Sequence, residues 1–199
     1  MKTENIQALL SFLKDAEQLK STLRSARTAT GRQESTAEHT WRLCLLAMLL
    51  ENEYQDLDMH KVLKICIIHD LGEAINGDIP AVEQTDSSDK AIEERQDLLT
   101  LLSHLPDRLK NEILSLWDEY ENAASREARL AKALDKIETL VQHTQGLNPD
   151  DFNYGFNLDY GKKYTCFDNL TLEIRRAIDK DTQMLGYSNG TCGKPDKEK

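Results

Sequence analysis

Glycine and proline are scarce in this chain of 199 residues, with nine and four copies respectively. A low content of turn-forming residues disfavours a protein built from many short strands joined by tight turns. Apolar residues instead recur at three- and four-residue intervals over long segments. We therefore predict an all-α fold, and the length suits one domain with a sizeable core.

Cysteines and long apolar runs are also sparse. The four cysteines show no paired metal-binding spacing, and Cys44 and Cys66 lie in apolar segments where a buried free thiol is the usual outcome. No apolar run approaches the length of a membrane span, and the first residues lack the apolar core of a signal peptide. We expect a cytoplasmic protein that makes no membrane contact.

Positive charge is in deficit, because 25 Lys and Arg residues stand against 35 Asp and Glu residues, a net charge of −10. A protein that wraps a nucleic-acid polymer needs a basic face, so we expect no such partner. A small nucleotide is still compatible with this charge, since one phosphate requires only a local cation or two.

An apolar run at residues 62–68 ends abruptly in His69 and Asp70. The run could be a buried helix or a buried strand. We favour a helix over residues 59–75, because Asp58 can cap its start and the segment is longer than most buried strands. Burying an imidazole and a carboxylate without partners is unfavourable, so other groups must satisfy them.

Further acidic and histidine side chains extend this pattern. In the predicted helix Glu73 lies one turn beyond His69 on the same face, and Asp78 follows the Asn-Gly pair that ends it. A capping-box sequence places His39 in the first full turn of another helix, and Asp135 lies in a later one. Two imidazoles and two carboxylates from separate helices could bind one divalent cation. A structural, hydrogen-bonded His-Asp pair is the alternative.

Six motifs follow one another along the chain: Glu38-His39, Ile68-His69-Asp70, Glu73, Gly77-Asp78-Ile79-Pro80, Leu116-Trp117-Asp118-Glu119-Tyr120-Glu121 and Leu134-Asp135-Lys136. Over roughly residues 5–145 they resemble the HD-domain metal-dependent phosphohydrolases, in the branch with the 5'-deoxynucleotidases and the HD domain-containing protein 2 group. The resemblance implies that a divalent cation is bound by His39, His69, Asp70 and Asp135. It also implies proton transfer by Glu73, and an Asp78 that orients the attacking water or contacts the sugar.

Periodicity alone does not place Asp135 in the core. The large apolar side chains of the helix predicted over residues 125–145 share one face, and Asp135 lies on nearly the opposite face, among alanines. This pattern predicts a surface position unless the alanine-lined face packs closely against another helix. We assign Asp135 to the cation mainly because its motif resembles that of the family.

Residues 20–34 contain no apolar period, and we predict a loop there. An arginine of this loop, Arg24 or Arg32, could hold a phosphate through bidentate hydrogen bonds. In the bacterial deoxynucleotidases an arginine followed by tryptophan contacts the substrate, and the matching positions resemble Arg24 and Ser25. The absent tryptophan leaves selectivity for deoxyribose over ribose open. An ordinary basic surface loop is the alternative.

The metal cannot be identified from the ligands alone. Imidazoles and carboxylates without thiolates suit Mn, Co, Fe, Ni or Zn better than a dedicated Mg site, and Mg stays among the candidates. A second cation held by Glu73 and Asp78 is an alternative arrangement.

As function we predict a metal-dependent phosphomonoester hydrolase, a 5'-nucleotidase acting on nucleoside or deoxynucleoside 5'-monophosphates. The alternatives are another HD phosphohydrolase, with a nucleoside triphosphate or phosphodiester substrate, and a non-catalytic metal-binding interaction protein. We predict one HD-type helical bundle over residues 1–185 with the metal between its central helices, a disordered tail at 186–199, and a homodimer. The segment 150–167 could cover the domain or complete the dimer surface.

The remaining expectations concern individual elements. Trp117 and Tyr120 should be core residues rather than ligand stackers, and residues 82–89 should form a mobile loop beside the site. Besides the helices already named, apolar spacing predicts helices over residues 5–19, 36–53 and 90–105, one starting near Pro106, and one over 169–185.

Overall fold

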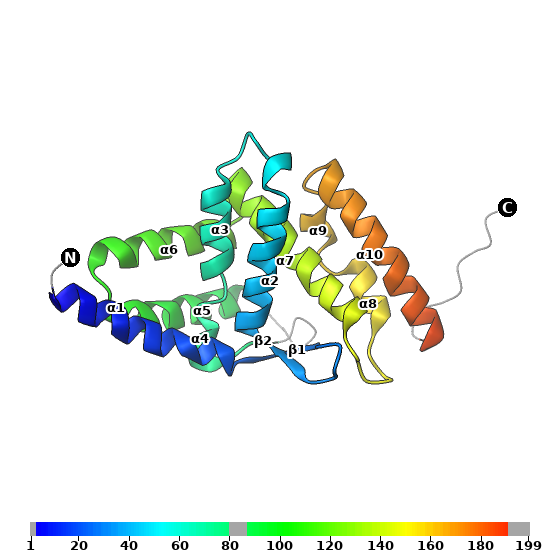
Figure 1. The fold of residues 1–199 in the computed structure, drawn as a ribbon, viewed down its shortest axis with the longest axis horizontal. Helices are drawn as coiled ribbons and strands as arrows, with labels where there is room; N and C mark the ends of the chain where they lie inside the picture. Colours follow the sequence, from blue (N-terminus) through cyan, green and yellow to red (C-terminus); the bar gives the residue numbers. More distant parts are fainter. Residues whose placement is uncertain (1–2, 80–86, 191–199) are drawn as a thin grey trace.

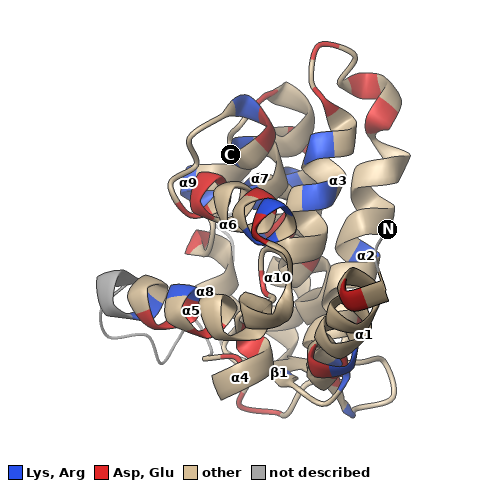
Figure 2. Ribbon diagram, turned by 90° about the vertical axis from the view of Figure 1, so that its left-hand side faces the viewer, with Lys and Arg blue, Asp and Glu red and all other residues tan. Residues whose placement is uncertain are grey.

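The computed structural model describes residues 3–79 and 87–190, which form a helical bundle with one small hairpin (Figure 1). The helices are α1 (Thr3–Ala16), α2 (Thr36–Leu49), α3 (Met59–Ile68), α4 (Glu73–Asn76), α5 (Ser87–Leu101), α6 (Asp107–Glu121), α7 (Arg126–Gln145), α8 (Tyr154–Asp159), α9 (Lys162–Thr165) and α10 (Asn169–Ser188). The strands are β1 (Leu23–Arg27) and β2 (Gln33–Ser35). The prediction of an all-α class is confirmed. Charged residues of both signs are interspersed along the helices (Figure 2). None of the helices in the described ranges has the length and apolar character that crossing a membrane requires.

Helix α7 runs through the middle of the molecule, with α2 and α3 on one side and α8 to α10 on another (Figure 1). Leu130, Leu134, Ile137 and Leu140 are fully buried, and so are the alanines on its other face, Ala128 and Ala131. Small side chains let α2 and α3 approach closely, so both faces of α7 are covered. As a result Asp135 is only 4% exposed, and the surface position that periodicity predicts is wrong.

The helix predicted over residues 59–75 breaks after Ile68, and this prediction is wrong in its second half. The chain turns at residues 70–72 before the single turn of α4. The turn lets the Trp117 indole donate to the His69 carbonyl at 3.0 Å. Gly72 then packs directly on α5, where an added Cβ would lie 2.6 Å from the Glu94 carbonyl oxygen. Tertiary contacts therefore override the helical pattern at this point.

The segment predicted as a loop, residues 20–34, instead forms most of the antiparallel hairpin β1–β2. Strand pairing places Leu23 opposite Ser35 and Arg27 opposite Gln33. Of β1 only Ala26 is buried, which explains why no alternating apolar pattern marks the strand. The hairpin is tied to α7 by the Gln142 amide, which donates to the Arg27 carbonyl at 2.5 Å. The sequence of the hairpin therefore gives little indication that it forms strands.

The C-terminal third packs against α7 as α8, α9 and α10 (Figure 1). The buried guanidinium of Arg175 donates to the carbonyls of Asn157, Leu158 and Tyr160, so α10 holds α8 and the turn after it in place. Helix α10 extends to Ser188, so the start of the predicted disordered tail is helical. Residues 191–199 of that tail and most of the predicted loop at 82–89 lie outside the described residues.

Candidate metal centre and substrate pocket

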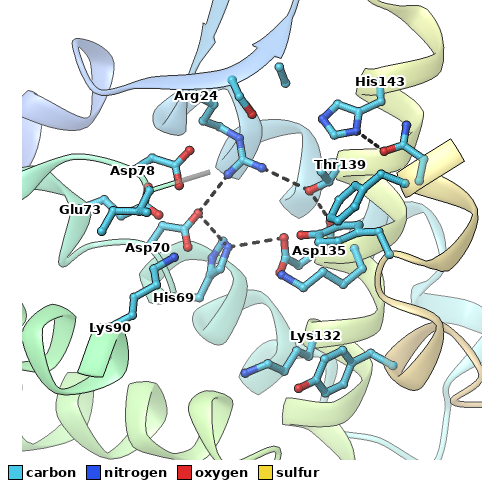
Figure 3. A pocket seen from close by; sticks show the side chains of 18 of the residues that line it. Arg24, His69, Asp70, Glu73, Asp78, Lys90, Lys132, Asp135, Thr139 and His143 are labelled. Atoms are coloured by element: carbon cyan, nitrogen blue, oxygen red, sulfur yellow. Dashed lines mark hydrogen bonds and ion pairs between the residues drawn. The ribbon is translucent and has the colours of Figure 1, made fainter. Parts of the chain in front are cut away.

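His69, Asp70 and Asp135 line the floor of a pocket beside α3 and α7 (Figure 3), and the buried imidazole of His39, on α2, lies against the two carboxylates. His39 Nε2 lies 3.3 Å from Asp135 Oδ1, and His69 Nε2 lies 3.0 Å from Asp70 Oδ2. The two cross distances, His39 to Asp70 and His69 to Asp135, are 3.8 and 4.0 Å. Both Nε2 atoms are buried and accept or donate no hydrogen bond among the described residues. Four convergent donors, two of them unsatisfied, form a set that fits a divalent cation.

Local sequence explains how each of these groups reaches the floor. Ser35 caps α2 by accepting from the Glu38 amide while the Glu38 carboxylate accepts from the Ser35 amide, so His39 falls in the first turn. His69 ends α3, and its Nδ1 donates to the Cys66 carbonyl at 2.8 Å, which leaves Nε2 free to act as a ligand. Asp135 comes from the centre of α7.

Asp135 is oriented by two side chains behind it. The Tyr120 hydroxyl donates to Asp135 Oδ2 at 2.6 Å, and Lys136 Nζ lies 2.9 Å from the same oxygen. Burial raises the pKa of Asp135, but Lys136 and His39 outweigh it and hold that pKa well below its ordinary value. Trp117 is a buried core residue as predicted. Tyr120 is buried too, but it also lines the pocket. The contact of Tyr120 with Asp135 was not foreseen.

His39 is oriented by an acid that the sequence did not single out. Its ring, 0% exposed, forms a short hydrogen bond through Nδ1 to Glu138 Oε2. Arg42 donates from Nε to Glu138 Oε1 at 2.6 Å. Burial and Arg24 lower the pKa of His39, but Glu138 and Asp135 outweigh them and raise it to about 9. The metal-free imidazole therefore holds a proton at neutral pH, which a cation at Nε2 must displace.

We expect Glu138→Gln to weaken binding of a divalent cation by about 10- to 100-fold, the usual cost of removing a group that orients a metal-ligating histidine. Glutamine keeps the shape of the side chain but removes the charge that fixes Nδ1–H. Calorimetric titration with Mn²⁺, Co²⁺ and Zn²⁺ measures the affinity. Asp118→Asn is the matched control, since Asp118 is also paired with an arginine, Arg95, at 2.7 Å. Equal affinities in both variants would contradict the role of Glu138.

Arg24 reaches the pocket from β1. Its Nη1 lies 3.5 Å from Asp70 Oδ2, and its Nη2 donates to Thr139 Oγ1 at 3.2 Å. Burial lowers the pKa of Arg24, but Asp70 and Asp78 raise it further, so the guanidinium stays charged. Arg32 is not brought to this pocket. Its exposed guanidinium pairs with Glu38 at 2.5 Å, on the outside of α2.

Glu73 and Asp78 line the pocket beside Asp70. Glu73 is 5% exposed, and its Oε2 accepts from Thr36 Oγ1 at 3.0 Å. Burial, followed by the charges of Asp70 and Asp78, raises the pKa of Glu73 to about 10. Asp78 follows Gly77, whose φ of +87° makes the turn that brings the aspartate to the site. An acidic cluster of this kind is poised to receive positive charge.

The pocket above this floor has a volume of about 550 Å³, within the range of small-molecule sites. Its lining also includes the cations Lys90, Lys132 and Lys136, in addition to Arg24. Its outer wall comes from residues 149–164, which contribute Phe152, Phe156, Tyr160 and Tyr164. No motif marked this wall in advance, although its aromatic and amide-rich composition is visible in the sequence.

Comparisons with known proteins bear on the family and the fold of this chain. A family model described as "HD domain" matches residues 16–175. The chain is 33% identical over 138 residues to "5'-deoxynucleotidase HDDC2" of Xenopus laevis, covering 68% of each protein. It is 30% identical over 141 residues to the human protein of that name, covering 70% of this chain and 68% of the other. A crystal structure of a predicted metal-dependent phosphohydrolase from Magnetospirillum magnetotacticum superposes with a TM-score of 0.76 at 26% identity, covering 92% and 95% of the two chains.

Proposed function

The chain belongs to the HD domain family, and on this basis we propose that it is a metal-dependent phosphohydrolase that converts nucleoside 5'-monophosphates to nucleoside and phosphate. The observation that carries the proposal is the convergence of His39, His69, Asp70 and Asp135 below a charged arginine in a nucleotide-sized pocket. Relatives named 5'-deoxynucleotidase support the substrate class.

We propose that these four side chains hold the divalent cation. Bound there, it would polarise a phosphoryl oxygen and lower the pKa of a coordinated water. The ligand set contains no thiolate and suits Mn, Co, Fe, Ni or Zn, with Mg also able to bind. Glu138 and Cys66 orient the two imidazoles, and Tyr120 and Lys136 orient Asp135.

Arg24 is placed to bind the phosphoryl group. Its two terminal nitrogens face Asp70 and Thr139, on either side of the space above the floor. A guanidinium in this position can donate to two equatorial oxygens and neutralise the charge that develops during in-line displacement. Arg32 does not line this pocket and pairs with Glu38, so we propose Arg24 rather than Arg32 for this role.

Glu73 is the group best placed to move a proton. Thr36 fixes its Oε2, which leaves Oε1 as the atom that accepts the proton from the attacking water. Asp78 lies beside it on the pocket wall and is proposed to orient that water or to contact a sugar hydroxyl.

The experiment that tests the proposal uses protein freed of metal with a chelator and then supplied with each of the six metals. Phosphate release is measured from ribo- and deoxyribonucleoside 5'-monophosphates, nucleoside triphosphates and cyclic nucleotides. We expect release from the monophosphates alone, abolished by the chelator. Preferential turnover of triphosphates or phosphodiesters would place the protein in another branch of the family, and metal binding without turnover would indicate a non-catalytic protein.

We further propose a cytoplasmic location and a homodimer. Within residues 3–79 and 87–190 the thiols of Cys44, Cys66 and Cys166 are free, which supports a reducing compartment. Exposed apolar side chains on α2, namely Trp41, Met48 and Leu49, support a contact between subunits. Light scattering in solution measures the assembly state.

A further inference from the structure

One end of the pocket differs in chemistry from the rest. Asp135, Thr139 and His143 follow one another at four-residue intervals along the same face of α7, and all three line the pocket (Figure 3). His143 therefore lies about 12 Å along the helix from the metal floor, at a rise of about 1.5 Å per residue. This spacing suits a ligand whose phosphate lies at the floor and whose opposite end lies beside His143.

The other ends of the pocket are charged and internally paired. Lys90 forms an ion pair with Glu94 at 3.1 Å. Lys132 lies 3.3 Å from Glu121 and also donates to the Tyr120 carbonyl at 3.2 Å. Those regions offer little neutral surface to an aromatic ligand.

The end beside His143 is largely aromatic, and Lys136 Nζ lies 5.4 Å from the centroid of its Tyr160 ring. Phe152 packs edge-on to the His143 ring at 5.1 Å between centroids, and Phe156 packs on Tyr160 at 5.6 Å. Burial, together with the charge of Arg24, lowers the pKa of His143 to about 4, so the ring is uncharged at neutral pH. Two half-buried phenyl rings beside a neutral imidazole provide a surface on which another aromatic ring can pack.

This end also contains an unsatisfied polar group. Asn157 is 1% exposed, lines the pocket, and pairs its Oδ1 with His143 Nδ1 at 3.0 Å. Its Nδ2 has no acceptor among the described residues. Arg175 donates to the Asn157 carbonyl at 2.9 Å, which fixes the backbone beneath the amide. With Nδ1–H donated to Asn157, neutral His143 keeps Nε2 as an acceptor, so the pair offers one donor and one acceptor.

We propose that Phe152, Phe156, His143 and Asn157 form a nucleobase subsite, in which the base packs against the phenyl rings and exchanges hydrogen bonds with the amide–imidazole pair. The inference rests on the proposed function, since it takes the ligand to be a nucleotide with its phosphate at the metal floor. The small side chains of Ser25 and Thr139 line the space between, where the sugar would lie. Recognition of this kind distinguishes a nucleotide from a sugar phosphate that lacks a base.

The test compares a deoxynucleoside 5'-monophosphate with deoxyribose 5-phosphate, which carries the same phosphoester without a base. In the Phe152→Leu, Phe156→Leu double variant we expect the ratio of the two kcat/KM values to fall about tenfold, mainly through the KM of the nucleotide, because base stacking on an aromatic ring is lost. Phe12→Leu, a phenylalanine on α1 outside the pocket, is the matched control and should keep the ratio of the parent protein.

A second readout separates this inference from the proposed function. Calorimetric binding of the deoxynucleoside needs no turnover, and we expect it to be about tenfold weaker in the double variant and in Asn157→Ala. If the double variant fails to fold, each single Phe→Leu variant should bind the deoxynucleoside about threefold more weakly than the parent protein does. A parent protein that hydrolyses neither phosphoester would overturn the proposed function only. An unchanged kcat/KM ratio together with unchanged deoxynucleoside affinity would overturn the subsite.

Discussion

Asp135→Asn is expected to remove tight binding of the divalent cation and to lower kcat/KM by more than about 100-fold. Losing a group that only orients a metal ligand costs up to about 100-fold, so losing a ligand itself should cost more. Asparagine keeps the size of the side chain and can still pair with Tyr120, but it lacks the negative charge that faces the imidazoles. Asp135 Oδ1 lies 3.3 Å from His39 Nε2 and 4.0 Å from His69 Nε2, so the substitution removes negative charge from a point near both imidazoles. Metal content after dialysis and calorimetric titration measure the loss.

The control for this variant is Asp181→Asn, which removes one negative charge from the exposed side of α10. It should bind metal and turn over substrate as the parent does, which separates a local effect from a change in net charge. Thermal unfolding of both variants shows whether they remain folded, since Asp135→Asn also leaves the half-buried ammonium of Lys136 without its charged partner. Stoichiometric metal binding by folded Asp135→Asn would exclude Asp135 as a ligand.

The parts of the site that follow from sequence are those fixed by nearby residues. The capping box at residues 35–38 sets the first turn of α2, and the apolar run at 62–68 sets the buried helix that ends in His69. In both cases the local signal determines where a histidine lies along its helix. The resemblance to a family then links the helices, a step that composition and periodicity do not supply.

The parts that sequence could not indicate depend on contacts between distant segments. Glu138 meets His39 and Arg42 across 99 and 96 residues respectively, and nothing around Glu138 distinguishes it from a surface glutamate. Asp135 is buried only because α2 and α3 cover the alanine face of α7. The aromatic wall at residues 149–164 gains a function only when α10 holds it over the pocket through Arg175. Tertiary packing decided each of these outcomes.

The second large effect is expected from Glu73→Gln, which should keep metal affinity within a few fold yet lower kcat by about 10²- to 10⁴-fold, the range attributed to a general acid–base group. In the metal-free protein, burial and the charges of Asp70 and Asp78 keep Glu73 protonated, with a pKa of about 10. A cation held by Asp70 would offset the charge of that carboxylate and lower the pKa of Glu73, which would let Glu73 accept a proton. Glutamine retains a hydrogen bond with Thr36 but cannot accept the proton.

The pH dependence of the free energy of unfolding reports the protonation of Glu73 without requiring turnover. The unfolded chain releases the Glu73 proton near its ordinary pKa of 4.5, whereas the folded metal-free protein holds it up to about pH 10. Between these values the folded state binds more protons, so this residue makes the free energy of unfolding fall as pH rises. Urea unfolding of chelator-treated protein between pH 5 and pH 8 should therefore show a steeper decline for the parent than for Glu73→Gln. Parallel declines of the two proteins would contradict a protonated Glu73. Full turnover by Glu73→Gln would show that the carboxyl group that accepts from Thr36 takes no part in the chemistry.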